Sequence, residues 1–234
     1  PVKGRAFDLI LCNPPFVISP SMNSGFRDNE FELDFLLQKI LKEAPDHLAP
    51  SGFFQTTCEW VQVQGEEWTE RIESWLHNNG CDAWILEANC QLPESYARNR
   101  LRETSSSDAT DMISLDKYLD YFDKRNVEAI RGGLIFLRKR EGSNWRDFSN
   151  LRKAVTKPIG DAVLQGFANR DLIHSSNSRD SIMISRLVIC RGIQQQEQSH
   201  WSGDDWTIDA IRLQNGAGIP CEVVIDEQVR DRKS

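Results

Sequence analysis

The first 140 residues alternate between short apolar runs and stretches in which apolar residues recur every three or four positions. Apolar runs bounded by turn residues predict buried strands, and the three-to-four spacing predicts amphipathic helices. We therefore expect strands at 7–12, 52–58, 83–86 and 133–137, and helices at 30–43, about 66–76 and 115–126. The polar, serine-rich segment 102–110 predicts a loop. Alternating strands and helices predict an α/β sheet flanked by helices.

Beyond about residue 141 this alternation stops. A helical pattern near 148–168 precedes strand-like runs at 183–190, 206–213 and 221–225. The chain is therefore expected to contain two parts, a sheet domain at 1–140 and a smaller mixed or β-rich unit at 141–234.

Composition and charge narrow the class of protein. Hydrophobic residues make up 39% of the chain and charged residues 27%, as in a packed globular protein. No apolar run reaches the roughly 18–20 residues of a membrane span, and residues 1–7 lack the apolar core of a secretory signal. We expect a cytoplasmic protein without a membrane partner.

The net charge of −7 argues against a broad basic surface for nucleic acid. One stretch departs from this balance, because residues 138–157 contain seven lysines and arginines against two acidic residues. This stretch either contacts phosphates or is a solvated surface. The six cysteines and four histidines are scattered without close ligand pairs, so we expect structural thiols and no metal site.

The sequence Asn13-Pro14-Pro15-Phe16 follows the first predicted strand directly. Ligands of open α/β sheets bind beyond the carboxyl ends of the strands. The prolines restrict the backbone, and the Asn13 side chain supplies an oxygen acceptor beside the backbone carbonyls. Two acceptors can hold both hydrogens of one NH2 group, while Phe16 offers a face for a planar amide or base. The alternative is an ordinary turn that ends a strand.

Glu59 also follows a predicted strand. It either faces the same site or is a surface carboxylate, as glutamates commonly are.

The run from Phe7 to Phe16 resembles the fourth strand and catalytic loop of class I S-adenosylmethionine-dependent methyltransferases that act on amino or amide nitrogens. Further segments resemble a bacterial small-domain or HemK-like subgroup of that family. These segments are 26–28, 65–68, 82–84, 96–97, 118–122 and 133–135.

The resemblance implies that Asn13 and the Pro14 carbonyl bind the target nitrogen, with Phe16 packed on its plane and Pro15 completing the motif. Asn13 would also lie beside the methyl group of the cofactor, S-adenosyl-L-methionine. Residues Phe26, Arg27 and Asp28 would lie in a loop near the substrate entrance, although Arg27 and Asp28 equally suit a local loop-stabilising pair. The acceptor would be a planar NH2 group of a protein glutamine, an adenine or a guanine.

The chain departs from the family at its beginning. The glycine-rich cofactor loop and the acidic cofactor residue of such enzymes precede the Asn-Pro-Pro motif, and only twelve residues precede Asn13 here. We therefore expect the C-terminal half of a Rossmann-like methyltransferase sheet, in which the last strand, 133–138, runs antiparallel to its neighbours. The isolated piece would be inactive without the missing N-terminal half. The alternative is a non-catalytic interaction domain derived from a methyltransferase.

Overall fold

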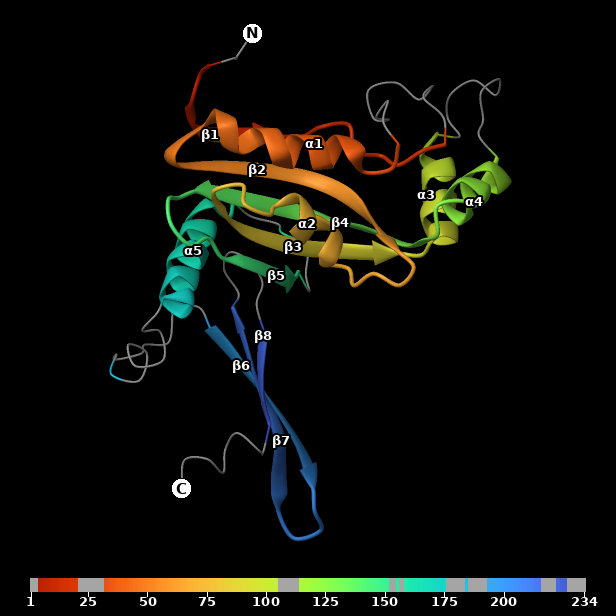
Figure 1. The fold of residues 1–234 in the computed structure, drawn as a ribbon. Coiled ribbons are helices and arrows are strands. Elements are labelled where there is room, and N and C mark those ends of the chain that lie inside the picture. The colour runs from red at the N-terminus through yellow and green to blue at the C-terminus, as the bar shows by residue number, and fades with distance from the viewer. Residues whose placement is uncertain are drawn as a thin grey trace. The chain divides into compact units, whose positions relative to one another are not determined.

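A computed structural model describes residues 4–20, 32–104, 114–151, 155, 158–175, 184, 193–215 and 222–226. The chain divides into two compact units, Pro1–Asn150 and Leu151–Ser234. The elements of the first unit are shown in Figure 1: β1 Phe7–Cys12, α1 Phe35–Glu43, the 3-10 helix η2 Ala44–His47, β2 Leu48–Val63, α2 Glu70–Trp75, β3 Cys81–Gln91, α3 Pro93–Thr104, α4 Leu115–Asp123, β4 Val127–Lys139 and β5 Arg146–Asn150.

The first unit is built on a five-stranded sheet in the order β1-β2-β4-β3-β5. Strand β1 is parallel to β2 and β3 is parallel to β5, whereas β4 runs antiparallel to both β2 and β3. The mixed sheet confirms the α/β prediction, and the antiparallel course of β4 confirms the orientation expected for 133–138. Because β1, β2, β3 and β5 run in one direction, their carboxyl ends lie at one edge of the sheet.

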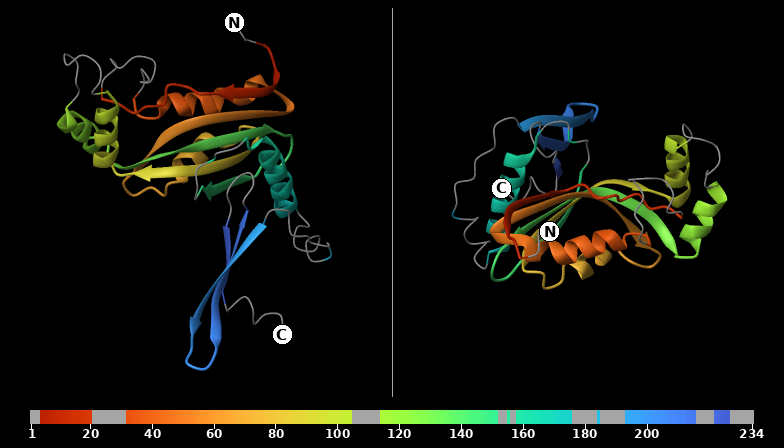
Figure 2. Two further views of the ribbon diagram at one scale, coloured as in Figure 1. Left: turned by 180° about the vertical axis from the view of Figure 1, so that it is seen from behind. Right: turned by 90° about the horizontal axis from the view of Figure 1, so that it is seen from above.

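One face of the sheet is covered by α1 and α2, as the views in Figure 2 show. The largest core cluster lies beneath these helices and includes Leu41, Trp60, Ile72 and Leu76, each with no exposed surface. Burying such side chains contributes roughly 1.5–3 kcal/mol each. The apolar stripe predicted for the second helix is therefore confirmed at Ile72 and Leu76.

A second core cluster lies where α3 and α4 meet the sheet. Phe122 is at its centre, with ring contacts to Tyr96, Tyr118 and Tyr121 at centroid distances of 6.0, 6.0 and 5.6 Å. Helix α3 begins just beyond the carboxyl end of β3, and α4 ends just before β4 begins. The topology therefore brings both helices to the edge of the sheet where β1 ends (Figure 1).

Several boundaries differ from the prediction. Segment 102–110 was expected to be a loop, but residues 102–104 form the end of α3, while 105–110 lie outside the described residues. The fourth strand was expected to begin at Gly133, yet β4 begins at Val127. Gly133 lies inside β4 opposite the irregularity of β3 between Glu87 and Asn89, where an added Cβ would meet the Leu86 carbonyl oxygen at 1.9 Å. A glycine is required there for close backbone approach.

The second unit contains α5, Gly160–His174, and a three-stranded sheet of β6 Ile193–Trp201, β7 Trp206–Asn215 and β8 Glu222–Asp226. All pairings in this sheet are antiparallel. Strands β7 and β8 correspond to the predicted runs at 206–213 and 221–225, and β6 was not predicted. Residues 183 and 185–190 lie outside the described residues.

The predicted helix 148–168 begins later than expected, because 146–150 forms β5 and joins the first sheet. Within the described residues, no helix is both long and apolar enough to cross a bilayer.

Candidate functional site at the carboxyl edge of the sheet

Asn13 lies directly after β1, at the edge where the parallel strands end. Its side chain is exposed, and its Oδ1 atom accepts a hydrogen bond from the Thr57 hydroxyl at 2.8 Å. The adjacent residue of β1, Cys12, pairs with Thr56 in β2, so the sheet register places Thr57 beside Asn13. A carbonyl oxygen has two lone pairs, so this contact orients the Asn13 side chain and leaves it capacity for a second donor.

The rest of the motif passes from solvent into the core. Pro15 is exposed, and Pro14 and Phe16 are half-buried. Two residues further on, Ile18 is 1% exposed. The motif is therefore an accessible loop that is held at both ends, by the sheet before Asn13 and by the core at Ile18.

The attachment at Ile18 is a hydrogen bond to a buried tyrosine. The Ile18 amide donates to the Tyr96 hydroxyl at 3.0 Å, and that hydroxyl donates to Glu59 Oε2 at 2.5 Å. The second oxygen of Glu59 accepts from the Arg100 guanidinium at 2.5 Å, and the guanidinium carbon lies 4.8 Å from the centre of the Tyr96 ring. Strand β2 and helix α3 thus combine in one polar cluster beneath the loop.

Burial governs the protonation of this cluster. Desolvation raises the pKa of Glu59, while the charge of Arg100 and the hydrogen bond from Tyr96 oppose that rise. Burial, followed by the charge of Glu59, raises the pKa of Tyr96 well above its ordinary value. Tyr96 is therefore a neutral phenol, and its hydroxyl donates the hydrogen bond to Glu59 Oε2. Glu59 is only 7% exposed, so the surface-carboxylate alternative is wrong.

Two further tyrosines contact the segments on either side of 21–31. The Tyr118 hydroxyl donates to Ser19 Oγ at 3.4 Å, and the Leu33 amide donates to the Tyr121 hydroxyl at 3.0 Å. The next residue, Asp34, is 3% exposed and accepts from the Val61 amide at 2.9 Å.

Asp34 also accepts two hydrogen bonds from Arg71, both at 2.8 Å. A bidentate arginine contact of this kind fixes geometry as well as charge. The predicted substrate-loop residues Phe26, Arg27 and Asp28 lie outside the described residues.

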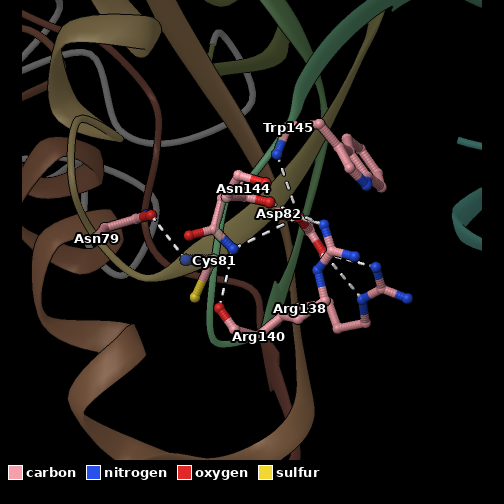
Figure 3. A network of polar contacts seen from close by, with 8 residues as sticks. Asn79, Cys81, Asp82, Arg138, Arg140, Asn144 and Trp145 are labelled. Atoms are coloured by element: carbon pink, nitrogen blue, oxygen red, sulfur yellow. Dashed lines mark hydrogen bonds and ion pairs between the residues drawn. The ribbon is translucent and has the colours of Figure 1, made fainter. Parts of the chain in front are cut away.

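The opposite edge of the sheet explains part of the basic stretch 138–157. Asp82 has no exposed surface and accepts from Arg138 Nη2 at 2.5 Å, from Arg140 Nη2 at 3.0 Å and from the Trp145 amide at 3.2 Å (Figure 3). The side chain of Asn144 bonds to the Arg140 carbonyl oxygen at 2.9 Å.

Two more cations of this stretch bind backbone carbonyls, Lys139 that of Pro45 and Arg146 that of Leu76. Four of the seven basic side chains therefore make internal contacts. Arg152, Lys153 and Lys157 lie outside the described residues.

Among the described side chains, no group of three or more His, Cys, Asp or Glu is arranged to hold a metal ion. Cys12, Cys58, Cys81 and Cys90 are free thiols. Burial raises the pKa of Cys58 and raises that of Cys81 to about 12, so both are protonated at neutral pH.

No family model matches the chain, and no curated protein matches it. Among solved structures, it is similar to a protein assigned as a sarcosine dimethylglycine methyltransferase from Galdieria sulphuraria. The identity is 16%, the TM-score is 0.27, and the match covers 58% of this chain and 54% of that chain.

It is also similar to phosphoethanolamine N-methyltransferase 2 of Haemonchus contortus, in complex with phosphomonomethylethanolamine and S-adenosylhomocysteine. Here the identity is 11%, the TM-score is 0.28, and the match covers 58% of this chain and 34% of that chain. The chain thus spans about half and about a third of these two structures. At such TM-scores the likeness carries no argument about activity.

The described residues supply little of a methyl-donor site. Asn13 is the single residue to which the sequence resemblance gives a cofactor contact. Gly65, with φ +85°, lies between a strand and a helix at the carboxyl edge, but Glu66 and Glu67 follow it without a second glycine. Within the described part of the chain, this edge of the sheet therefore offers an exposed acceptor oxygen at Asn13 without a glycine-rich turn beside it.

Proposed function

We propose that this chain is the acceptor-binding half of an S-adenosylmethionine-dependent methyltransferase that acts on a planar amino or amide nitrogen. The observation that supports it most is the exposed Asn13 side chain, which Thr57 orients and which lies at the carboxyl end of a parallel strand. Ligands of open α/β sheets occupy this edge. Phe16 and the Pro14 carbonyl complete the motif.

The chemistry asked of these residues is mainly orientation. Asn13 Oδ1 and the Pro14 carbonyl accept the two hydrogens of the target NH2 group, and Phe16 packs on its plane. The nitrogen lone pair then points out of that plane, which favours in-line attack. S-adenosylmethionine, if bound beside Asn13, would supply the methyl group and would itself become S-adenosylhomocysteine, while Asn13, the Pro14 carbonyl and Phe16 would hold the acceptor nitrogen.

The cofactor would be held mainly by further structure that pairs with β1. Strand β1 is at the end of the described sheet, and Leu9 and Leu11 on it are 58% and 68% exposed. Apolar side chains on an edge strand favour pairing with further structure. The same exposed leucines also favour the alternative, a non-catalytic interaction domain that binds a partner through β1.

Transfer of labelled methyl groups from S-adenosylmethionine tests the proposal. The parent protein, with its upstream residues, is assayed against a protein fraction and an RNA fraction. Label recovered on an exocyclic amine or a side-chain amide is the expected result. A parent protein that binds no S-adenosylmethionine and transfers no label contradicts the enzyme and favours the interaction domain.

The class of acceptor needs its own measurement. The internal contacts of Arg138, Lys139, Arg140 and Arg146 favour a protein acceptor over RNA, because these cations are committed within the fold. RNA binding is titrated at 50 and about 200 mM salt, since phosphate contacts weaken steeply over that range. Tight, strongly salt-dependent binding would contradict the protein acceptor.

A further inference from the structure

The hydroxyl groups of all three tyrosines of the chain bond to residues that flank segment 20–32. Tyr96 bonds to the Ile18 amide, Tyr118 to the Ser19 side chain and Tyr121 to the Leu33 amide. The three tyrosines come from α3 and α4, and their rings share Phe122 as a neighbour. Helices α3 and α4 thus bond to the chain at Ile18 and Ser19, just after the Asn-Pro-Pro-Phe loop, and again at Leu33, just before α1.

Tyr96 differs from the other two because its hydrogen bonds have a fixed direction. A phenol has one hydrogen to donate, and Tyr96 directs it to Glu59. Its oxygen lone pairs are therefore left for the Ile18 amide. Arg100 holds the other Glu59 oxygen and lies against the Tyr96 ring, so carboxylate and ring are both held in place.

We propose that Tyr96 is a positioning residue for the acceptor-binding loop, with Glu59 and Arg100 setting the direction of its hydroxyl. This inference rests on the proposed function. Ile18 is five residues beyond Asn13 and two beyond Phe16, so its place fixes the end of the loop that grips the target. Tyr96 touches neither target nor cofactor in this role. It holds the loop so that the two acceptor oxygens and the Phe16 ring keep fixed positions relative to the carboxyl edge of the sheet.

The chain offers a matched control. Tyr121 also accepts a backbone amide at 3.0 Å, but that amide belongs to Leu33, twenty residues beyond Asn13. Tyr96→Phe and Tyr121→Phe each remove one hydroxyl and retain the aromatic ring. A purely structural role predicts the same kinetic outcome for both variants, whereas positioning predicts a defect for Tyr96→Phe alone.

The experiment compares both variants with wild type in the parent protein. For Tyr96→Phe we expect kcat/KM for the acceptor to fall about tenfold or more, because a displacement of about 1 Å in such a site costs up to ~100-fold. The affinity for S-adenosylmethionine, measured by calorimetry, should stay within about twofold of wild type. Tyr121→Phe should keep kcat/KM within about threefold of wild type.

Amide hydrogen exchange supplies a readout that needs no catalysis. Exchange of the Ile18 amide should accelerate in Tyr96→Phe and stay as in wild type in Tyr121→Phe. Equal kinetic losses in the two variants, or unchanged exchange at Ile18 in Tyr96→Phe, would overturn the positioning role. A wild-type parent that transfers no methyl group contradicts the proposed function instead, and the exchange at Ile18 then decides the positioning role alone.

Two changes at Glu59 keep the inference testable if Tyr96→Phe folds poorly. Glu59→Gln leaves one oxygen where Arg100 and Tyr96 both donate, so the NH2 group replaces one acceptor and the acceptor kinetics should fall toward those of Tyr96→Phe. Glu59→Leu removes both oxygens and should reproduce the defect of Tyr96→Phe. If both variants transfer methyl groups like wild type, Glu59 does not set the direction of the hydroxyl.

Discussion

Each edge of the sheet contains a carboxylate that is almost wholly buried and paired with arginine, and the two differ in what they reach. Asp82, at the edge where β3 begins, bonds to Arg138, Arg140 and the Trp145 amide, all from β4 and the turn that follows it. Glu59, near the opposite edge, bonds to Arg100 and Tyr96. The Tyr96 hydroxyl also accepts a hydrogen bond from the Ile18 amide at the end of the Asn-Pro-Pro-Phe loop.

This difference indicates that the Asp82 network stabilises the fold, whereas the Glu59 cluster also supports the proposed acceptor-binding loop. The Asp82 network is closed, because its partners return to neighbouring strands of the same sheet. The Glu59 cluster is open, because one of its hydrogen bonds continues into an exposed loop that carries Asn13. We therefore expect changes at Asp82 to appear in stability and changes around Asn13 to appear in turnover.

The largest expected effect is on stability at the closed network. Asp82→Ala leaves Arg138 and Arg140 without their carboxylate, and breaking a buried pair in this way costs about 3–5 kcal/mol. The free energy of unfolding from urea titration measures the loss. Asp46→Ala, which removes an exposed carboxylate in η2, is the control and should change stability by less than about 0.5 kcal/mol. A loss at Asp82 as small as that of the control would remove the contrast between the two edges.

The next effect is on turnover at the open edge. Asn13→Ala removes the acceptor oxygen proposed to hold the target amine, and we expect kcat to fall roughly 100-fold, as for loss of one oriented polar group. Stability should fall by no more than about 1 kcal/mol, because the Asn13 side chain is exposed and loses only its hydrogen bond from Thr57. Asn99→Ala, an exposed asparagine of α3 bonded to Gln91, is the control. Full turnover in Asn13→Ala would show that the loop does not bind the acceptor.

The sequence predicts β1 and the motif that follows it better than the buried cluster of Glu59, Tyr96 and Arg100. Strand 7–12 was predicted with its observed bounds, because a continuous apolar run ends at the turn residues of the motif. The α/β class followed from the same alternation of patterns. Both signals are local, which is why they can be read without knowing the fold.

Helix α3 was missed because its buried face is small and partly polar. It consists of Tyr96 and Ala97 with the partly buried Arg100 and Leu101, in a helix whose other residues are mostly polar or charged. Two local signals were available, Pro93 at the helix start and the contact between Glu94 and Arg98, four residues apart. The pairings of Glu59 with Arg100 and of Asp82 with Arg138 span 41 and 56 residues and depend on the assembled sheet, so no local pattern indicates them.

A subtler change tests how Asn13 is oriented. Thr57→Val keeps the shape of the side chain and removes the hydrogen bond to Asn13 Oδ1. Such a bond contributes about 1 kcal/mol, so kcat/KM for the acceptor should fall roughly fivefold. Thr56→Val is the matched control, because Thr56 is fully buried and its hydroxyl bonds to the Thr57 carbonyl oxygen instead. Thr56→Val should lose stability and keep the kcat/KM of wild type. If kcat/KM falls in Thr56→Val and not in Thr57→Val, Thr57 does not orient Asn13.

The smallest effect is a pH dependence at Glu59. The groups that act on it are Arg100, Tyr96 and Glu103, all from α3, and burial is the largest cause of its raised pKa. Since the folded state binds this proton more tightly than the unfolded state, the stability that the proton contributes is full below the unfolded pKa of about 4.3 and is lost as pH rises through the raised folded value.

Urea unfolding of wild type and Glu59→Gln at several pH values between about 4 and 8 isolates this contribution. The unfolding free energy of wild type relative to Glu59→Gln should decrease as pH rises, because burial raises the pKa of Glu59 in the folded state. Glu103→Gln removes an exposed carboxylate that contacts the same arginine and contributes least to the raised pKa of Glu59, so the decrease should be smaller. A difference that grows with pH would mean that Arg100 outweighs burial, and Glu59 would then resemble Asp82 as an ion pair that stabilises the fold.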